Sequence, residues 1–149
     1  MIGRLVAVRV GMRPAHPAGG NQVPPLLSDQ LLPTPGAARH ARDMVTEACA
    51  MADLAELIGP AGLVADELVA NGVEHAGTLM TLRIISRAHY LHLAVGDGSP
   101  DPPRLPPLPP PTAPRGRGLI LVDAIATRWG WQPSGEGKVV WATLSMGSR

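Results

Sequence analysis

The sequence predicts an α+β fold, a two-layer sandwich in which helices pack on one face of a mostly antiparallel sheet. Apolar residues recur at helical spacing over 35–54 and 60–74, and then alternate with polar residues over 78–86 and 89–97. After a long proline-rich stretch, one more helical pattern and two more strand patterns follow between residues 116 and 145. Helices and strands that occur in such runs form separate layers.

Composition and charge exclude several classes of protein. A chain of 149 residues can form one domain that buries about two-thirds of its unfolded surface. The net charge of +1 gives no electrostatic reason to expect binding to nucleic acid or to a membrane. The single cysteine, Cys49, excludes a disulfide framework and a Cys-based zinc site. The apolar run near the N-terminus is broken by Arg9 and is too short for a signal peptide or a membrane span, so we expect a cytoplasmic protein.

The N-terminal part differs from the rest. Residues 1–34 are rich in proline and have no periodicity beyond "LVAVRV", so we expect a mobile leader or an edge element, followed by one domain over 35–146. The first helical pattern, 35–54, places apolar residues, Cys49 among them, on one face and most charged residues elsewhere.

The second helical pattern begins after Gly59, with Pro60 in its first turn, and is expected to run to about Glu74. Along it, Glu67, Asn71 and His75 recur at intervals of four and therefore lie within about 80° on one face. A carboxylate can accept a proton from an attacking hydroxyl, and an amide oxygen suits Mg²⁺. Alternatively, Glu67 lies at a solvated rim and Asn71 satisfies a backbone group.

The two strand patterns at 78–86 and 89–97 predict a hairpin with a tight turn near Arg87. It ends in Asp97-Gly98, where the carboxylate could accept a hydrogen bond from an exocyclic amine and the glycine could admit a ligand. Taken alone, this pair is more typical of an ordinary strand-ending turn.

Nine of the fifteen residues from Pro100 to Pro114 are proline, which excludes a helix or a central strand and predicts a lid or binding loop over about 100–115. The glycines of "RGRGL", Gly116 and Gly118, could let the start of the third helix bind phosphate, with Arg117 adding charge. Alternatively, these glycines form a hinge at the end of the proline-rich loop. Residues 129–145 predict two strands joined by a glycine-rich turn.

The order of these motifs resembles one family, the GHKL ATPases with the Bergerat ATP-binding fold, and within it the anti-sigma-factor serine/threonine kinases. "DELVANGVEHAG" resembles the N box, "VGDGSP" the adenine box, "GRGLILVDAIATRWGW" the glycine box with its helix, and "GKVVWATL" the closing strand. The resemblance covers roughly residues 35–144.

The resemblance implies ATP and Mg²⁺ as cofactors and assigns roles by motif. Glu67 would be the catalytic general base and Asn71 the Mg²⁺ ligand, while His75 would lie near the phosphates. Asp97, with Gly98, would bind adenine. The remaining cofactor-binding residues would be those of the glycine box, Gly116, Arg117, Gly118 and Leu119.

The implied function is a regulatory serine kinase that binds a sigma factor and phosphorylates an anti-sigma-factor antagonist on serine. A homodimer is left open. The alternative is a non-catalytic GHKL-fold binding module that regulates its partner by protein contact. The adenine box favours this alternative, because Asp97 is followed by Gly-Ser-Pro-Asp where the family usually has Asp-x-Gly-x-Gly.

Overall fold

Five antiparallel strands form one sheet with the order β1-β2-β3-β5-β4 in the computed structural model, which describes residues 25–103 and 118–145. The strands are β1 (Leu27–Leu31), β2 (Met80–Arg87), β3 (Tyr90–Asp97), β4 (Arg128–Ser134) and β5 (Gly137–Ser145). The β2–β3 and β4–β5 pairs are the two predicted hairpins. β5 also pairs with β3, so the last hairpin joins the centre of the sheet.

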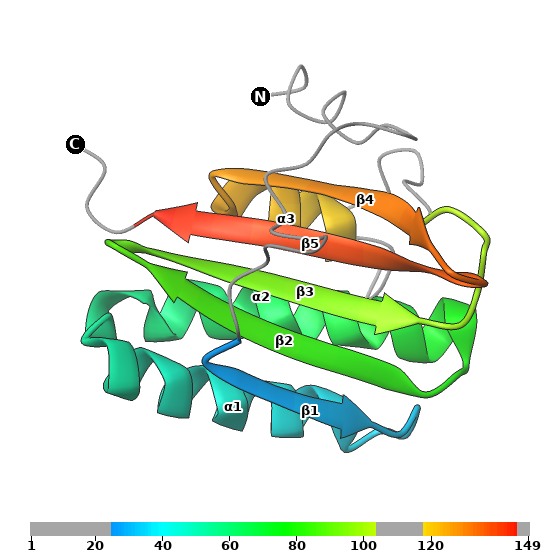
Figure 1. The fold of residues 1–149 in the computed structure, drawn as a ribbon, viewed down its shortest axis with the longest axis horizontal. Coiled ribbons are helices and arrows are strands. Elements are labelled where there is room, and N and C mark those ends of the chain that lie inside the picture. The colour runs from blue at the N-terminus through cyan, green and yellow to red at the C-terminus, as the bar shows by residue number, and fades with distance from the viewer. Residues whose placement is uncertain (1–24, 104–117, 146–149) are drawn as a thin grey trace, which may run out of the picture.

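Within the described residues, three α-helices cover the same face of this sheet (Figure 1). They are α1 (Ala37–Ala52), α2 (Ile58–Asn71) and α3 (Gly118–Ile125), with a short 3-10 turn, η2 (Ala55–Leu57), before α2. The predicted α+β two-layer sandwich is therefore confirmed. No helix in the described ranges is long and apolar enough to cross a membrane.

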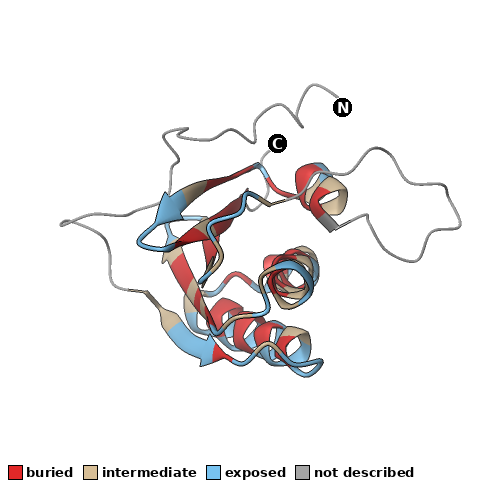
Figure 2. Cartoon of the chain, turned by 90° about the vertical axis from the view of Figure 1, so that its right-hand side faces the viewer, coloured by how far each residue is buried: buried red, intermediate tan, exposed pale blue. Residues whose placement is uncertain are grey.

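The core lies between the two layers, where the buried parts of helices and strands face one another (Figure 2). Alternate strand residues such as Leu82, Leu93 and Val140 point toward the helices, as expected from the period of two. Helix α2 packs between α1 and α3, which explains its largely apolar surface. Cys49 on α1 is fully buried, and burial raises the pKa of its thiol.

Strand β1 is the edge strand on the α1 side and pairs with β2. Its middle residues, Ser28, Asp29 and Gln30, are exposed, and only Leu31 is buried. This pattern has no clear alternation, which is why the sequence did not single it out as a strand. Exposed polar residues on an edge strand disfavour pairing with another sheet. Residues 1–24 lie outside the described part of the chain.

The helical winding of α2 continues beyond Asn71 as one π-helical turn, η3 (Gly72–Ala76). Gly77 ends it in a left-handed conformation, with φ of 65°, and its N–H donates to the Gly72 carbonyl oxygen at 2.9 Å. The sequence predicted an end at about Glu74, close to the observed one, but no change of winding. Single π-helical turns are frequently found at functional sites.

Candidate functional site

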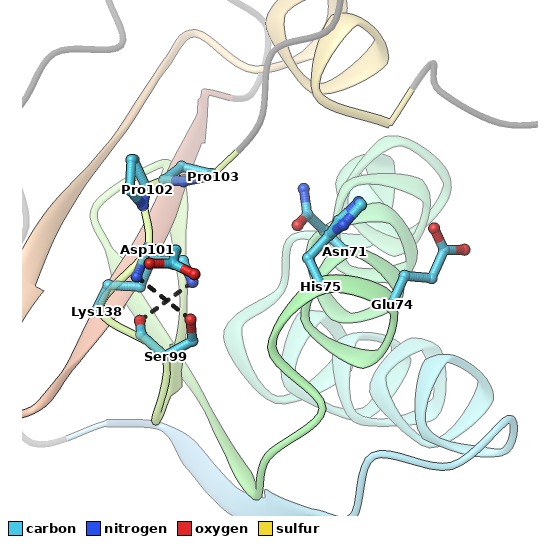
Figure 3. A pocket seen from close by; sticks show the side chains of 8 residues that line it. All are labelled: Asn71, Glu74, His75, Ser99, Asp101, Pro102, Pro103 and Lys138. Carbon is cyan, nitrogen blue, oxygen red and sulfur yellow. Dashed lines mark hydrogen bonds between the residues drawn. The ribbon is translucent and has the colours of Figure 1, made fainter.

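A pocket of about 320 Å³ opens between the end of α2 and the ends of β3 and β5. This volume is at the lower end of the range typical of small-molecule sites. Figure 3 shows two facing walls, one from α2 and η3 and the other from β5 and the segment after β3. The lining residues are Asn71, Glu74, His75, Ser99, Asp101, Pro102, Pro103 and Lys138.

The helical wall carries Asn71, His75 and Glu74 (Figure 3). Asn71 is the last residue of α2 and is half-buried, while Glu74 and His75 belong to the π-helical turn and are exposed. The Glu74 side chain points away from the Lys138 wall in this view. Asn71 and His75 are therefore the polar groups of α2 and η3 placed to meet a ligand that also contacts the opposite wall.

The opposite wall is organised by an ion pair between Lys138 of β5 and Asp97 of β3, which are direct partners in the sheet. The Lys138 Nζ lies 3.2 Å from Asp97 Oδ1 and 3.1 Å from Oδ2. The two side chains are 5% and 2% exposed, so the charges are almost fully removed from water. The ammonium also donates to the Ser99 carbonyl oxygen at 3.4 Å.

Two glycines allow the backbone to come close at this point. A Cβ on Gly137 would overlap the carbonyl group of Asp97, so this position requires glycine. On the other side, the Gly98 N–H donates to Thr78 Oγ1 at 2.8 Å, and the Ser99 N–H donates to Asp97 Oδ1 at 2.8 Å. These contacts fix the orientation of the Asp97 carboxylate toward Lys138.

We expect Gly137→Ala to lower the free energy of unfolding by about 1–3 kcal/mol, the usual effect of overpacking. The added methyl group must push β5 away from the end of β3. Thermal denaturation followed by circular dichroism measures the loss. Gly36→Ala is the matched control, because a Cβ there meets nothing within 4 Å. Equal melting temperatures for the two variants would contradict the close approach.

The structure brings together some of the sequence-predicted residues. Asn71 and His75 line the pocket; Asp97 and Gly98 lie beside it, with the Asp97 carboxylate turned to Lys138. Glu67 is half-buried one helical turn before Asn71 and is not among the lining residues.

The glycine-box residues lie at or before the start of α3. Gly118 is the first residue of α3, and Leu119 is 2% exposed and belongs to the hydrophobic core. The side chain of Leu119 therefore faces the core, and only its backbone could contact a cofactor. Gly116 and Arg117, together with residues 104–115 of the expected lid, lie outside the described residues.

Six of the lining residues were not selected from the sequence: Glu74, Ser99, Asp101, Pro102, Pro103 and Lys138. Lys138 was hidden in a strand pattern, "GKVVWATL", in which a lysine usually faces solvent. Its register opposite Asp97 could be found only by aligning β5 with β3. No hairpin turn joins β3 to β5, since the glycine-rich turn joins β4 to β5, so the sequence carries no local signal for this register.

The charged groups at this pocket determine how well it fits the expected cofactors, ATP and Mg²⁺. Glu74 and Asp101 contribute carboxylates, and the Lys138 ammonium is bound to Asp97. Within residues 25–103 and 118–145, no group of three or more His, Cys, Asp or Glu side chains could hold a metal ion by itself. Mg²⁺ commonly binds with one or two protein ligands and the phosphates of a nucleotide, so the Asn71 amide fits this role.

Asp97, which the family resemblance assigns to adenine, fits a nucleotide less well. An amine of a bound base would need the Asp97 carboxylate as its acceptor, and Lys138 already takes both of its oxygens. The residues present thus fit the metal and phosphate end of ATP and do not fit its adenine while the ion pair is closed.

Comparisons with known proteins agree with this fold. The model of one protein family, described as a histidine kinase-like ATPase domain, matches residues 31–144. Among solved structures, the RsbU and RsbW domains of Rv1364c from Mycobacterium tuberculosis match with a TM-score of 0.60 and 20% identity. That match covers 83% of this chain and 32% of the other, and at this identity it shows the fold alone. No curated protein matches the sequence.

Proposed function

The chain belongs to the histidine kinase-like ATPase domain family, and on that premise we propose that it is a regulatory serine kinase of the anti-sigma-factor type. It binds ATP with Mg²⁺, binds a sigma factor and phosphorylates an antagonist protein on serine in the cytoplasm. One observation carries the proposal: Asn71 and His75 face the ends of β3 and β5 across a pocket. This is the pair that the family resemblance assigns to the metal and the phosphates.

In this proposal, the residues of α2 and η3 have separate roles. Asn71 offers an amide oxygen to Mg²⁺, and His75 contacts the phosphates. Glu67 accepts the proton of the attacking serine hydroxyl, from a position one helical turn before Asn71. Bound ATP supplies the phosphoryl group. Because the pocket lining includes the carboxylates of Glu74 and Asp101, binding of the anionic nucleotide depends on the metal.

Isothermal titration calorimetry of the full chain with ATP tests this proposal. We expect measurable binding with Mg²⁺ and at least tenfold weaker binding without it. Asn71→Ala removes most of this Mg²⁺ dependence, because the substitution deletes the amide ligand while α2 keeps its packing residues.

Gln132→Ala is the matched control, because it deletes an amide on β4 that does not line the pocket. It should leave the effect of Mg²⁺ unchanged. Binding of ATP that is equally strong with and without Mg²⁺ in the parent protein would contradict the assignment of Asn71.

The second candidate function is a non-catalytic binding module with the same fold, acting on its partner by contact alone. The Lys138–Asp97 ion pair favours it, because Lys138 occupies the carboxylate that the family resemblance assigns to adenine. Transfer of labelled phosphate from ATP to an antagonist encoded beside this protein separates the two. Partner binding without transfer would leave the binding module as the function.

A further inference from the structure

We propose that the Lys138 ammonium occupies the position against Asp97 that an amine of a bound base would take. This side chain of the protein itself thereby determines the base specificity of the pocket. The inference rests on the proposed nucleotide-binding function and concerns the base specificity of that same site. Its consequence is a pocket that recognises the phosphates and metal of a nucleotide while discriminating poorly between bases.

The first support is that Lys138 contacts both oxygens of the Asp97 carboxylate, whose side chain is only 2% exposed. Oδ1 accepts from the Ser99 N–H at 2.8 Å and from Lys138 Nζ at 3.2 Å. Oδ2 is 3.1 Å from the same ammonium. The ammonium has three donors, and the two carboxylate oxygens and the Ser99 carbonyl oxygen provide three acceptors. A ligand amine must therefore displace Lys138 before it can bind Asp97.

The second support is the strength of the competing contact. Both contacts have an ionised acceptor, the Asp97 carboxylate, but only the ammonium adds the attraction between two full charges, because the amine of a base is neutral. The pair is also almost fully buried, so little water screens it. A base amine that replaces the ammonium therefore exchanges a stronger contact for a weaker one. It also leaves the lysine charge in need of a new partner.

The third support is that Lys138 belongs to the pocket. Its side chain lines the cavity together with Ser99 and Asp101 (Figure 3). Gly137 brings β5 close to the end of β3, and the direct sheet pairing of Asp97 with Lys138 places the two groups face to face. The long, flexible lysine stem could swing toward the cavity, where the carboxylate of Asp101 lies. A bound base can thus displace the Lys138 ammonium from the Asp97 carboxylate.

The test is calorimetric titration of the full chain with Mg²⁺-ATP and Mg²⁺-GTP, because adenine carries an exocyclic amine where guanine carries a carbonyl oxygen. We expect the parent protein to bind both nucleotides within a factor of about three. Lys138→Thr removes the ammonium and makes room, so the ratio of ATP affinity to GTP affinity should rise about tenfold or more, whereas the lost lysine charge acts on both nucleotides alike. Lys138→Arg keeps a cation against Asp97 and should show no gain.

Asp97→Asn in the parent provides a second measurement should Lys138→Thr fail to fold, because asparagine still offers Lys138 an acceptor oxygen. We expect its ratio of ATP affinity to GTP affinity to match that of the parent. A parent that prefers ATP at least tenfold, with the preference lost in Asp97→Asn, overturns the inference and leaves the proposed function intact. If the parent and a folded Lys138→Thr variant both fail to bind either nucleotide, the proposed function falls with the inference.

Discussion

Replacing Glu67 with glutamine is expected to slow phosphoryl transfer to a serine of the antagonist by about 10²–10⁴-fold, the usual contribution of a general base. Glutamine keeps the size of the side chain but cannot accept the proton of the hydroxyl. ATP affinity should change by less than a factor of about two, because Glu67 is not among the residues that line the pocket. Single-turnover transfer of labelled phosphate measures the rate, and calorimetry measures the affinity.

Asp66→Asn is the matched control for this variant. Asp66 is the neighbouring carboxylate on α2, but it faces α1, where Arg42 Nη1 donates to Asp66 Oδ2 at 2.8 Å. Its loss should leave the transfer rate nearly unchanged. Glu74 does not serve as a control, because it lines the pocket. A transfer rate that is insensitive to Glu67→Gln, or equally sensitive to Asp66→Asn, would exclude Glu67 as the base.

Much of the fold could be predicted because local pattern and tertiary packing agree. The apolar face of α1 and the alternation in β2 and β3 are both determined by the same buried layer, so periodicity alone reveals them. Strand β1 could not be predicted in this way. Three of its five residues are exposed, and pairing with β2 along the sheet edge, which leaves no periodic signal, holds it in place.

The site was predictable where its residues share one element. Asn71 and His75 are four positions apart along α2 and its π-helical turn, so helical spacing brings them together before any tertiary contact is known. Lys138 could not be found in this way, because it is separated from Asp97 by 41 residues and meets it only through the register of β5 on β3. The sequence identifies Asp97 as a candidate acceptor but does not reveal that the chain supplies its own donor.

The same ion pair leads to the largest stability effect that we expect. Lys138→Met should lower the free energy of unfolding by about 3–5 kcal/mol, because it leaves the Asp97 carboxylate buried without its partner cation. Methionine keeps most of the length of the lysine stem, so lost packing contributes little. Urea denaturation followed by circular dichroism measures the change.

The double variant Asp97→Asn/Lys138→Met decides whether the charge or the packing is responsible. Breaking a buried pair by removing one partner is strongly destabilising, whereas removing both charges is often close to neutral. We therefore expect the double variant to be more stable than Lys138→Met alone, by about 2 kcal/mol or more, with a coupling energy of that size between the two positions. Strictly additive losses would mean that the two side chains act independently. In that case Lys138 would not hold Asp97 strongly enough to compete with a bound base.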